Sequence, residues 1–192
     1  TQGTGDRSVN KDLGFTRAHH VMLSYGFKIS DNMNMKIEPY FQQLYDVPVI
    51  ADSSYSVLNR RDFYVENALV NRGKGRNIGV DITLERYLNK GLYYMVTASI
   101  FDSKYYGGDR KWRNTLYNRN FIINVLGGKE WMVGRDKQNM FSVNFKITLQ
   151  GGDRYAPVDE VATLLDPDRE VQYDENFQTI LTDVYHEFLR GV

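Results

Sequence analysis

Residues 75–88 alternate between apolar and polar side chains, and this alternation constrains the fold more than any other feature of the chain. The apolar set is Ile78, Val80, Ile82 and Leu84. The intervening set is Asn77, Gly79, Asp81, Thr83 and Glu85. Because successive side chains of a β-strand point to opposite faces of a sheet, the segment predicts a strand with one apolar face and one polar face.

The same pattern recurs along the chain and predicts six strands. These are expected at residues 15–29, 33–45, 75–88, 92–105, 115–131 and 139–150. At about 12 to 15 residues they are much longer than the roughly five or six residues of an ordinary globular strand. Pro39 has no backbone N–H to donate, so we expect a local break in strand pairing beside it.

The connections between these strands alternate in length. Short turns follow the first, third and fifth strands, and long segments, here called outer loops, follow the others at 46–74, 106–114 and 151–192. Tight turns on one side and longer loops on the other are typical of an antiparallel transmembrane β-barrel. About ten residues at roughly 3.3 Å each, tilted near 40°, also match its apolar band, which is about 25 Å tall.

Charge decides which face of each strand meets lipid. A charge at the bilayer midplane costs roughly 2–4 kcal/mol in a barrel, so the polar face is expected to line a watery lumen. The predicted lumen-facing residues are Lys36, Glu38, Asp81, Glu85, Asn120, Asn124, Lys146 and Gln150. Aromatic residues near strand ends predict an interfacial girdle of Tyr25, Tyr45, Tyr87, Tyr93, Tyr94, Trp131 and Phe141.

Six strands are too few to close a membrane barrel, because bacterial barrels have about eight or more. We therefore expect the chain to be part of a larger barrel. Residues 177–192 fit two alternatives: the start of a seventh strand, or a short amphipathic helix with Ile180, Val184, Phe188 and Leu189 on one side.

Composition narrows the possible functions. The chain has no cysteine, which excludes disulfides and thiolate metal sites, and no apolar run approaches the roughly 18 residues of a spanning helix. Basic residues outnumber acids by seven in residues 1–150, and acids outnumber bases by seven in 151–192. The basic residues are scattered rather than clustered, so we expect no nucleic-acid partner.

Several segments resemble the C-terminal barrel half of TonB-dependent outer-membrane receptors of the Bacteroidetes type. The longest is ALVNRGKGRNIGVDITLERYLNKGLYYMVTASIFDSKYYGGD, from Ala68. The others are LGFTRAHHVMLSY at 13–25, KIEPYFQQLYDVPV at 36–49, WRNTLYNRNFIINVLGGKEW at 112–131 and QGGDRYAPVD at 150–159. The resemblance implies a barrel of about 22 strands, with a plug domain and a TonB box that have no counterpart in these residues.

By that resemblance, the whole protein lies in the outer membrane of a Gram-negative bacterium and imports a nutrient such as an iron-siderophore, cobalamin or an oligosaccharide. Its implied partners are membrane lipid and lipopolysaccharide, the TonB complex and a surface lipoprotein. Two alternatives stay open: a passive porin-like channel and a soluble ligand-binding β-barrel. We expect no enzymatic activity and no cofactor, because no nucleophile motif accompanies the histidines.

Candidate ligand contacts lie in or near the outer loops: Arg60, Arg61, Tyr64, Tyr105, Arg110 and Trp112. Arginines there attract anions and aromatics stack on planar or sugar ligands, although solvated loop charges and lipid-interface anchors have the same composition. We expect no metal site, because His19 and His20 are adjacent in a strand and point to opposite faces. Residues 159–176 are rich in acidic side chains but lack the ordered aspartate pattern of a calcium-binding loop. We therefore expect a solvated loop that contains a short helix, with Leu164 and Leu165 packed beneath that helix, rather than a calcium site.

Overall fold

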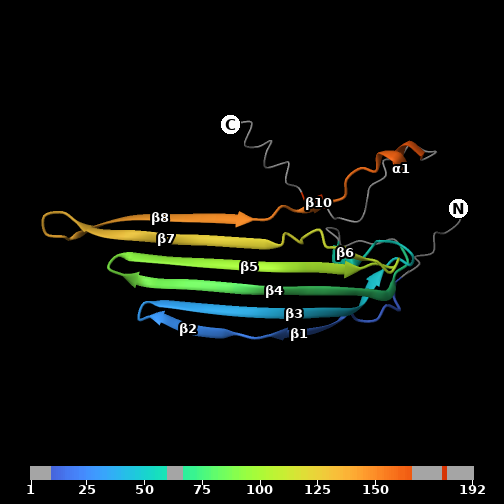
Figure 1. Ribbon diagram of the computed structural model, residues 1–192, viewed down its shortest axis with the longest axis horizontal. Helices are drawn as coiled ribbons and strands as arrows, with labels where there is room; N and C mark the ends of the chain where they lie inside the picture. Colours follow the sequence, from blue (N-terminus) through green and yellow to red (C-terminus); the bar gives the residue numbers. More distant parts are fainter. Residues whose placement is uncertain (1–9, 60–66, 166–178, 181–192) are drawn as a thin grey trace, which may run out of the picture.

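The computed structural model describes residues 10–59, 67–165 and 179–180, and most of them form one antiparallel sheet (Figure 1). Its strand order is β1-β3-β4-β5-β7-β8, with β2 also paired to β3 and β6 to β5. The strands are β1 Arg17–Met22, β2 Tyr25–Ser30, β3 Met33–Val49, β4 Val70–Asn89, β5 Leu92–Tyr106, β6 Trp112–Asn114, β7 Phe121–Val133 and β8 Asn139–Gln150. The remaining elements are the 3-10 helix η1 Val57–Asn59, β9 Arg154–Tyr155, α1 Glu160–Leu165 and β10 Thr179–Ile180, which pairs with β9.

The predicted strands are found, with some differences at their ends. The strand expected at 139–150 is observed with those bounds as β8, and β3 and β4 are longer than expected. The strand expected at 15–29 is divided into β1 and β2, and the break lies beside Pro39, as its missing donor predicts. The strand expected at 115–131 is wrong at its start, because 115–120 is loop and β7 begins at Phe121.

All three short connections lie at one end of the sheet and the long ones lie at the other (Figure 1). We call these the turn end and the loop end. Asp31-Asn32 and Lys90-Gly91 are two-residue hairpin turns at the turn end. Lys90 and Gly91 both have positive φ, 51° and 75°, as a tight hairpin turn requires. Strand β3 ends at Val49 and β4 begins at Val70, so the first outer loop is shorter than the expected 46–74. The second is observed at 107–120, with β6 inside it, rather than at 106–114.

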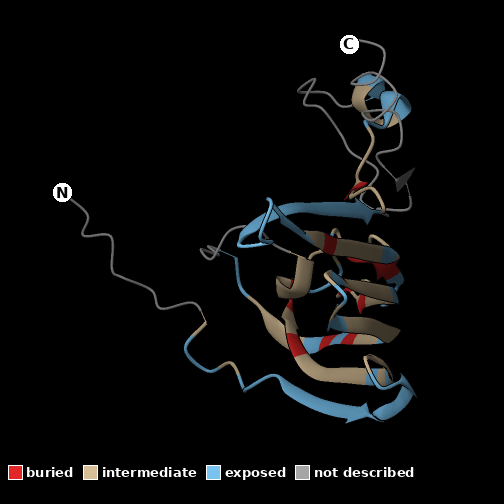
Figure 2. Ribbon diagram, turned by 90° about the vertical axis from the view of Figure 1, so that its left-hand side faces the viewer, coloured by how far each residue is buried: buried red, intermediate tan, exposed pale blue. Residues whose placement is uncertain are grey.

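The sheet is a single layer, and no second layer of described residues packs on it. Only at the loop end does η1 lie against the strands, with Leu58 beside Gly75. The edge strands β1, β2 and β8 are exposed along their whole length, and the strands between them are half-buried (Figure 2). Only three apolar residues in the described ranges are buried, Val47, Val49 and Tyr105, and they lie at the loop end. Leu164 and Leu165 are 85% and 77% exposed, so the expectation that they pack beneath a helix is wrong.

The described part of the chain contains no helix that is both long enough and apolar enough to cross a membrane.

Candidate functional site

The register of the strands gives the sheet two chemically different faces. On one face, which we call the apolar face, Pro39 lies opposite Val80 and Ile37 opposite Ile82. The same alignment continues into β5, β7 and β8, where Val125 lies opposite Ile147. Phe145 and Ile147 are each 51% exposed. The apolar side chains are therefore aligned across the sheet but not packed into a dry interior.

The opposite face, the polar face, is connected by hydrogen bonds that run from strand to strand. Asn77 donates to Gln42 Oε1 at 2.7 Å and accepts a bond from the Ser103 hydroxyl at 2.6 Å. Nearer the turn end, Thr148 donates to Asn124 Oδ1 at 2.9 Å, and Asn124 donates to Thr97 at 3.3 Å. Each amide thus joins three neighbouring strands through side chains alone.

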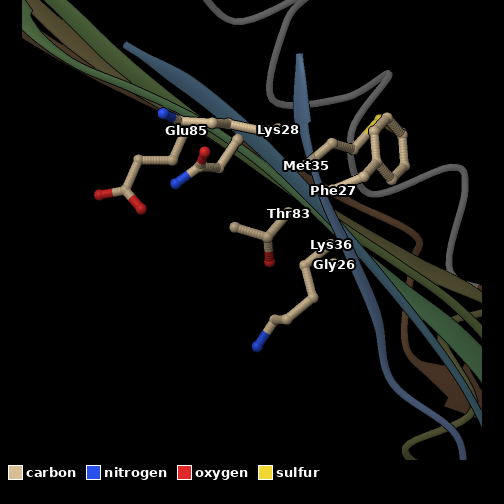
Figure 3. A pocket seen from close by; sticks show the side chains of 8 residues that line it. Gly26, Phe27, Lys28, Met35, Lys36, Thr83 and Glu85 are labelled. Carbon is tan, nitrogen blue, oxygen red and sulfur yellow. The ribbon is translucent and has the colours of Figure 1, made fainter. Parts of the chain in front are cut away.

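Three charged residues of the polar face, Lys36, Glu38 and Asp81, also have local partners. Lys36 Nζ lies 2.8 Å from Glu38 Oε2, and the Ser24 hydroxyl donates to Glu38 at 2.9 Å. Asp81 accepts a 2.6 Å bond from the Ser99 hydroxyl. Figure 3 shows this sidedness near the turn end. There Lys28, Lys36, Thr83 and Glu85 project to one side of the sheet, and Phe27 and Met35 to the other.

Seven of the eight predicted lumen-facing residues lie in strands and share this polar face by register. Lys146 and Gln150 are exposed on the edge strand β8, where Gln150 accepts a 2.8 Å bond from Arg119. Asn120 is the exception. It precedes β7 with a φ of 66° and donates to the Phe101 carbonyl at 3.4 Å, so its placement in a strand is wrong.

A hollow of about 420 Å³ lies on the polar face toward the loop end. Its lining combines aromatic and hydrogen-bonding groups: His20, Tyr40, Asn77, Asp81, Phe101 and Tyr117. A Cβ added at Gly79 would meet the Tyr40 hydroxyl at 2.6 Å, so glycine there leaves room for the tyrosine ring. This hollow was not predicted, because its residues are brought together only by the register of β1, β3, β4 and β5.

The loop end is packed and hydrogen-bonded in a way that the sheet is not. Arg113, 7% exposed, donates to both oxygens of Asp109 at 2.9 and 2.6 Å, and this holds the pKa of Asp109 below its ordinary value. Asn118 is fully buried, donates to Asp102 and Asn114 at 2.9 Å, and accepts the Ser103 N–H at 3.0 Å. Loop 107–120 is thereby fixed to the end of β5.

The candidate ligand contacts have different outcomes. Arg60, Arg61 and Tyr64 lie outside the described residues. Tyr105 is 1% exposed and packs in the loop-end core, so its side chain presents almost no surface to a ligand. Arg110 is exposed, and Trp112, 43% exposed, lies against the Tyr106 ring with the Arg76 guanidinium 5.4 Å from its own ring centroid.

Aromatic and basic residues border the apolar face at both ends. Trp131 and Phe141 pair at 5.7 Å at the turn end, and Tyr106 and Trp112 pair at 5.4 Å at the loop end. Not every predicted girdle residue belongs to this border. Tyr93 donates to Asn144 at 2.9 Å, which places its hydroxyl on the polar face, opposite to Trp131 and Phe141.

The histidines are placed as their adjacency predicts. His19 contacts Tyr45, with ring centroids 5.4 Å apart, and His20 contacts Tyr40 at 6.3 Å. Within the described ranges, no group of three or more His, Cys, Asp or Glu side chains is arranged to hold a metal ion.

Comparison of the chain with protein families, with curated proteins and with solved structures finds no match. The two faces of the sheet and the loop end are therefore the features from which a function can be inferred.

Proposed function

We propose that this chain forms part of the wall of an outer-membrane transporter of the TonB-dependent type. The observation that carries the proposal is the bare apolar face of a single-layer sheet. An aligned set of half-exposed Val, Ile, Leu and Phe side chains is stable only against another apolar phase, because exposed apolar surface costs about 25 cal/mol per Å² in water. Bilayer hydrocarbon supplies that phase in a barrel whose polar face is inside.

The height of the uncharged part of this face fits a bilayer. On β4 it extends from Arg76 to Arg86, with only apolar side chains between them on that face. Ten residues at roughly 3.3 Å each, tilted by about 40°, cover about 25 Å, which is the height of the apolar band of a membrane barrel. Trp112 and Trp131 lie near the two ends of this band, where interfacial aromatics belong.

The polar face fits the inner wall of such a barrel. Its amides and hydroxyls bond across three strands at a time, and Lys36 and Glu38 form an ion pair on it. A surface of this kind is stable against water or against a hydrated plug domain. In this proposal the loop end is extracellular and the two-residue turns are periplasmic.

The open edges of the sheet are consistent with a larger barrel. Only one side of β1, β2 and β8 is hydrogen-bonded within the described sheet, and unsatisfied backbone groups are not tolerated in hydrocarbon. Further strands must therefore complete both edges. By the resemblance given above, the complete protein would import a scarce nutrient with energy from the TonB complex, and the exposed loop residues Arg110 and Trp112 are candidates to meet it.

Two measurements separate this proposal from its alternatives. A TonB-dependent transporter predicts that the same coding region also specifies a signal peptide, a plug domain and roughly sixteen further strands; a complete short gene without a plug would favour a passive channel. A membrane wall also predicts that the chain aggregates in buffer and becomes monodisperse in detergent, measured by light scattering. A folded monomer in buffer alone would support the soluble barrel instead.

A further inference from the structure

Two cations border the apolar face at the turn end, and neither has an acidic partner within the described ranges. Arg86 lies on β4 and Lys129 on β7, on either side of β5. Neither forms an ion pair in the part of the chain that the structure describes, and Nε of Arg86 is buried without a hydrogen-bond partner. Lys129 Nζ donates to the Lys90 carbonyl at 2.7 Å, which leaves further donors.

A groove of about 300 Å³ begins beside Lys129 and continues along the apolar face. Arg86 is not part of its lining but lies opposite the lining residue Tyr94 in register. Its lining is almost wholly apolar: Leu92, Tyr94, Val96, Val125, Val143 and Phe145. Gly127 lies between Tyr94 and Phe145 in register. A Cβ there would meet Tyr94 Cβ at 3.1 Å and Phe145 Cε1 at 3.2 Å. The absence of a side chain at Gly127 therefore leaves space between these two side chains. Trp131 closes the groove at its turn end, with Lys129 6.0 Å from its ring.

We propose that this groove and the two cations form a binding site for one anionic phospholipid of the leaflet at the turn end. The acyl chains occupy the groove, and the phosphate lies between the guanidinium of Arg86 and the ammonium of Lys129. These residues are two strands apart and offset by two residues along the strands, which is about 12 Å between backbones, so their two long side chains can extend to one phosphate group. The inference rests on the membrane assignment proposed above.

Charge complementarity selects the headgroup. Two unpaired cations favour a lipid with net negative charge, such as phosphatidylglycerol, over a zwitterionic lipid whose own ammonium competes for the phosphate. A Lys or Arg near an anionic membrane surface strengthens binding by roughly fivefold per residue. The groove supplies the apolar contact that a free phosphate ion would lack.

Trp131 is a reporter already in place, because it lines the groove and the only other tryptophan in the chain is Trp112. The experiment uses the full chain with the substitution Trp112→Phe, reconstituted in phosphatidylcholine vesicles. Trp131 fluorescence is measured against an increasing mole fraction of dibrominated phosphatidylglycerol, and separately of dibrominated phosphatidylcholine. We expect the anionic quencher to be enriched around Trp131 by roughly tenfold or more.

Arg86→Gln and Lys129→Gln should each reduce this preference by about fivefold, and Lys129→Arg should retain it. The matched control is Lys146→Gln, which removes a lysine from the polar face and should change nothing. Equal quenching by both lipids, or an equal loss of preference in the control, would contradict the proposed phospholipid-binding site while leaving the membrane assignment intact. No quenching of Trp131 by either lipid would overturn both.

Discussion

The loop end and the sheet are stabilised in different ways, although they belong to the same strands. The loop end resembles the interior of a water-soluble protein, with buried Val47, Val49 and Tyr105 and a fully buried, fully bonded Asn118. The sheet has no comparable interior, and the side chains on both of its faces stay at least partly exposed. The difference indicates that the loop end is self-sufficient in water, while the apolar face of the sheet needs a covering that the described residues do not supply.

A charge placed on the apolar face gives the strongest test of this contrast. Val80→Arg should destabilise the lipid-reconstituted protein by about 3 kcal/mol, because the arginine would lie near the middle of the apolar band. Denaturant unfolding in vesicles measures the effect. Thr83→Arg is the matched control: it is three residues along the same strand on the polar face, and it should cost less than about 0.5 kcal/mol. Equal costs at both positions would remove the distinction between the faces.

The stability of the loop end should instead depend on its own polar contacts and on pH. Asp109→Asn removes the ion pair between Asp109 and the buried Arg113 and should cost about 2 kcal/mol, in detergent and in lipid alike. The lowered pKa of Asp109 means that its stabilising contribution is fully present above the ordinary value of 3.8 and is lost as the pH falls below it. Unfolding measured from pH 7 to pH 2 should show this loss in the native protein and not in the Asn variant.

A smaller effect is expected on the polar face. Asn124→Ala removes the hydrogen bonds to Thr97 and Thr148 and should cost about 1 kcal/mol. The cost is small because water can bond to the two threonine hydroxyls in the variant. Ser142→Ala, on the same face of the exposed strand β8, has no such bond among those described and serves as the control. If Asn124→Ala were as costly as Val80→Arg, the polar face would be a dry interface rather than a wetted wall.

The same contrast explains what was predictable from the sequence. Residues 139–150 alternate without interruption, and β8 has those bounds, because period-two patterning is a local property that each strand carries by itself. Prolines and turn residues likewise act locally, so the break beside Pro39 and the turn at Lys90-Gly91 were foreseeable. Face membership followed from the same periodicity for seven of the eight polar residues.

The loop end was not predictable, because its contacts join residues that no periodicity relates. Tyr105 was expected to meet ligand, yet it is buried where loop 107–120 folds back on β5. Asn120 was expected in a strand, yet its positive φ ends the loop just before β7. The hollow lined by Tyr40 and Phe101 depends on the register of four strands, which alternation alone does not fix.

The central claim is that the apolar face contacts hydrocarbon while the polar face contacts water, and cysteine accessibility along β4 tests it most directly. The chain has no cysteine, so single substitutions at position 78 and at consecutive positions from 80 to 85 each give one reporter site. Gly79 is left unchanged because a Cβ there would clash with Tyr40. In vesicles, a membrane-impermeant maleimide should label the odd-numbered positions Asp81, Thr83 and Glu85. A fluorophore attached in detergent to the even-numbered positions Val80, Ile82 and Leu84 should, after reconstitution, be quenched by brominated lipid. Labelling and quenching without this two-residue period, or with the two sets exchanged, would contradict the account.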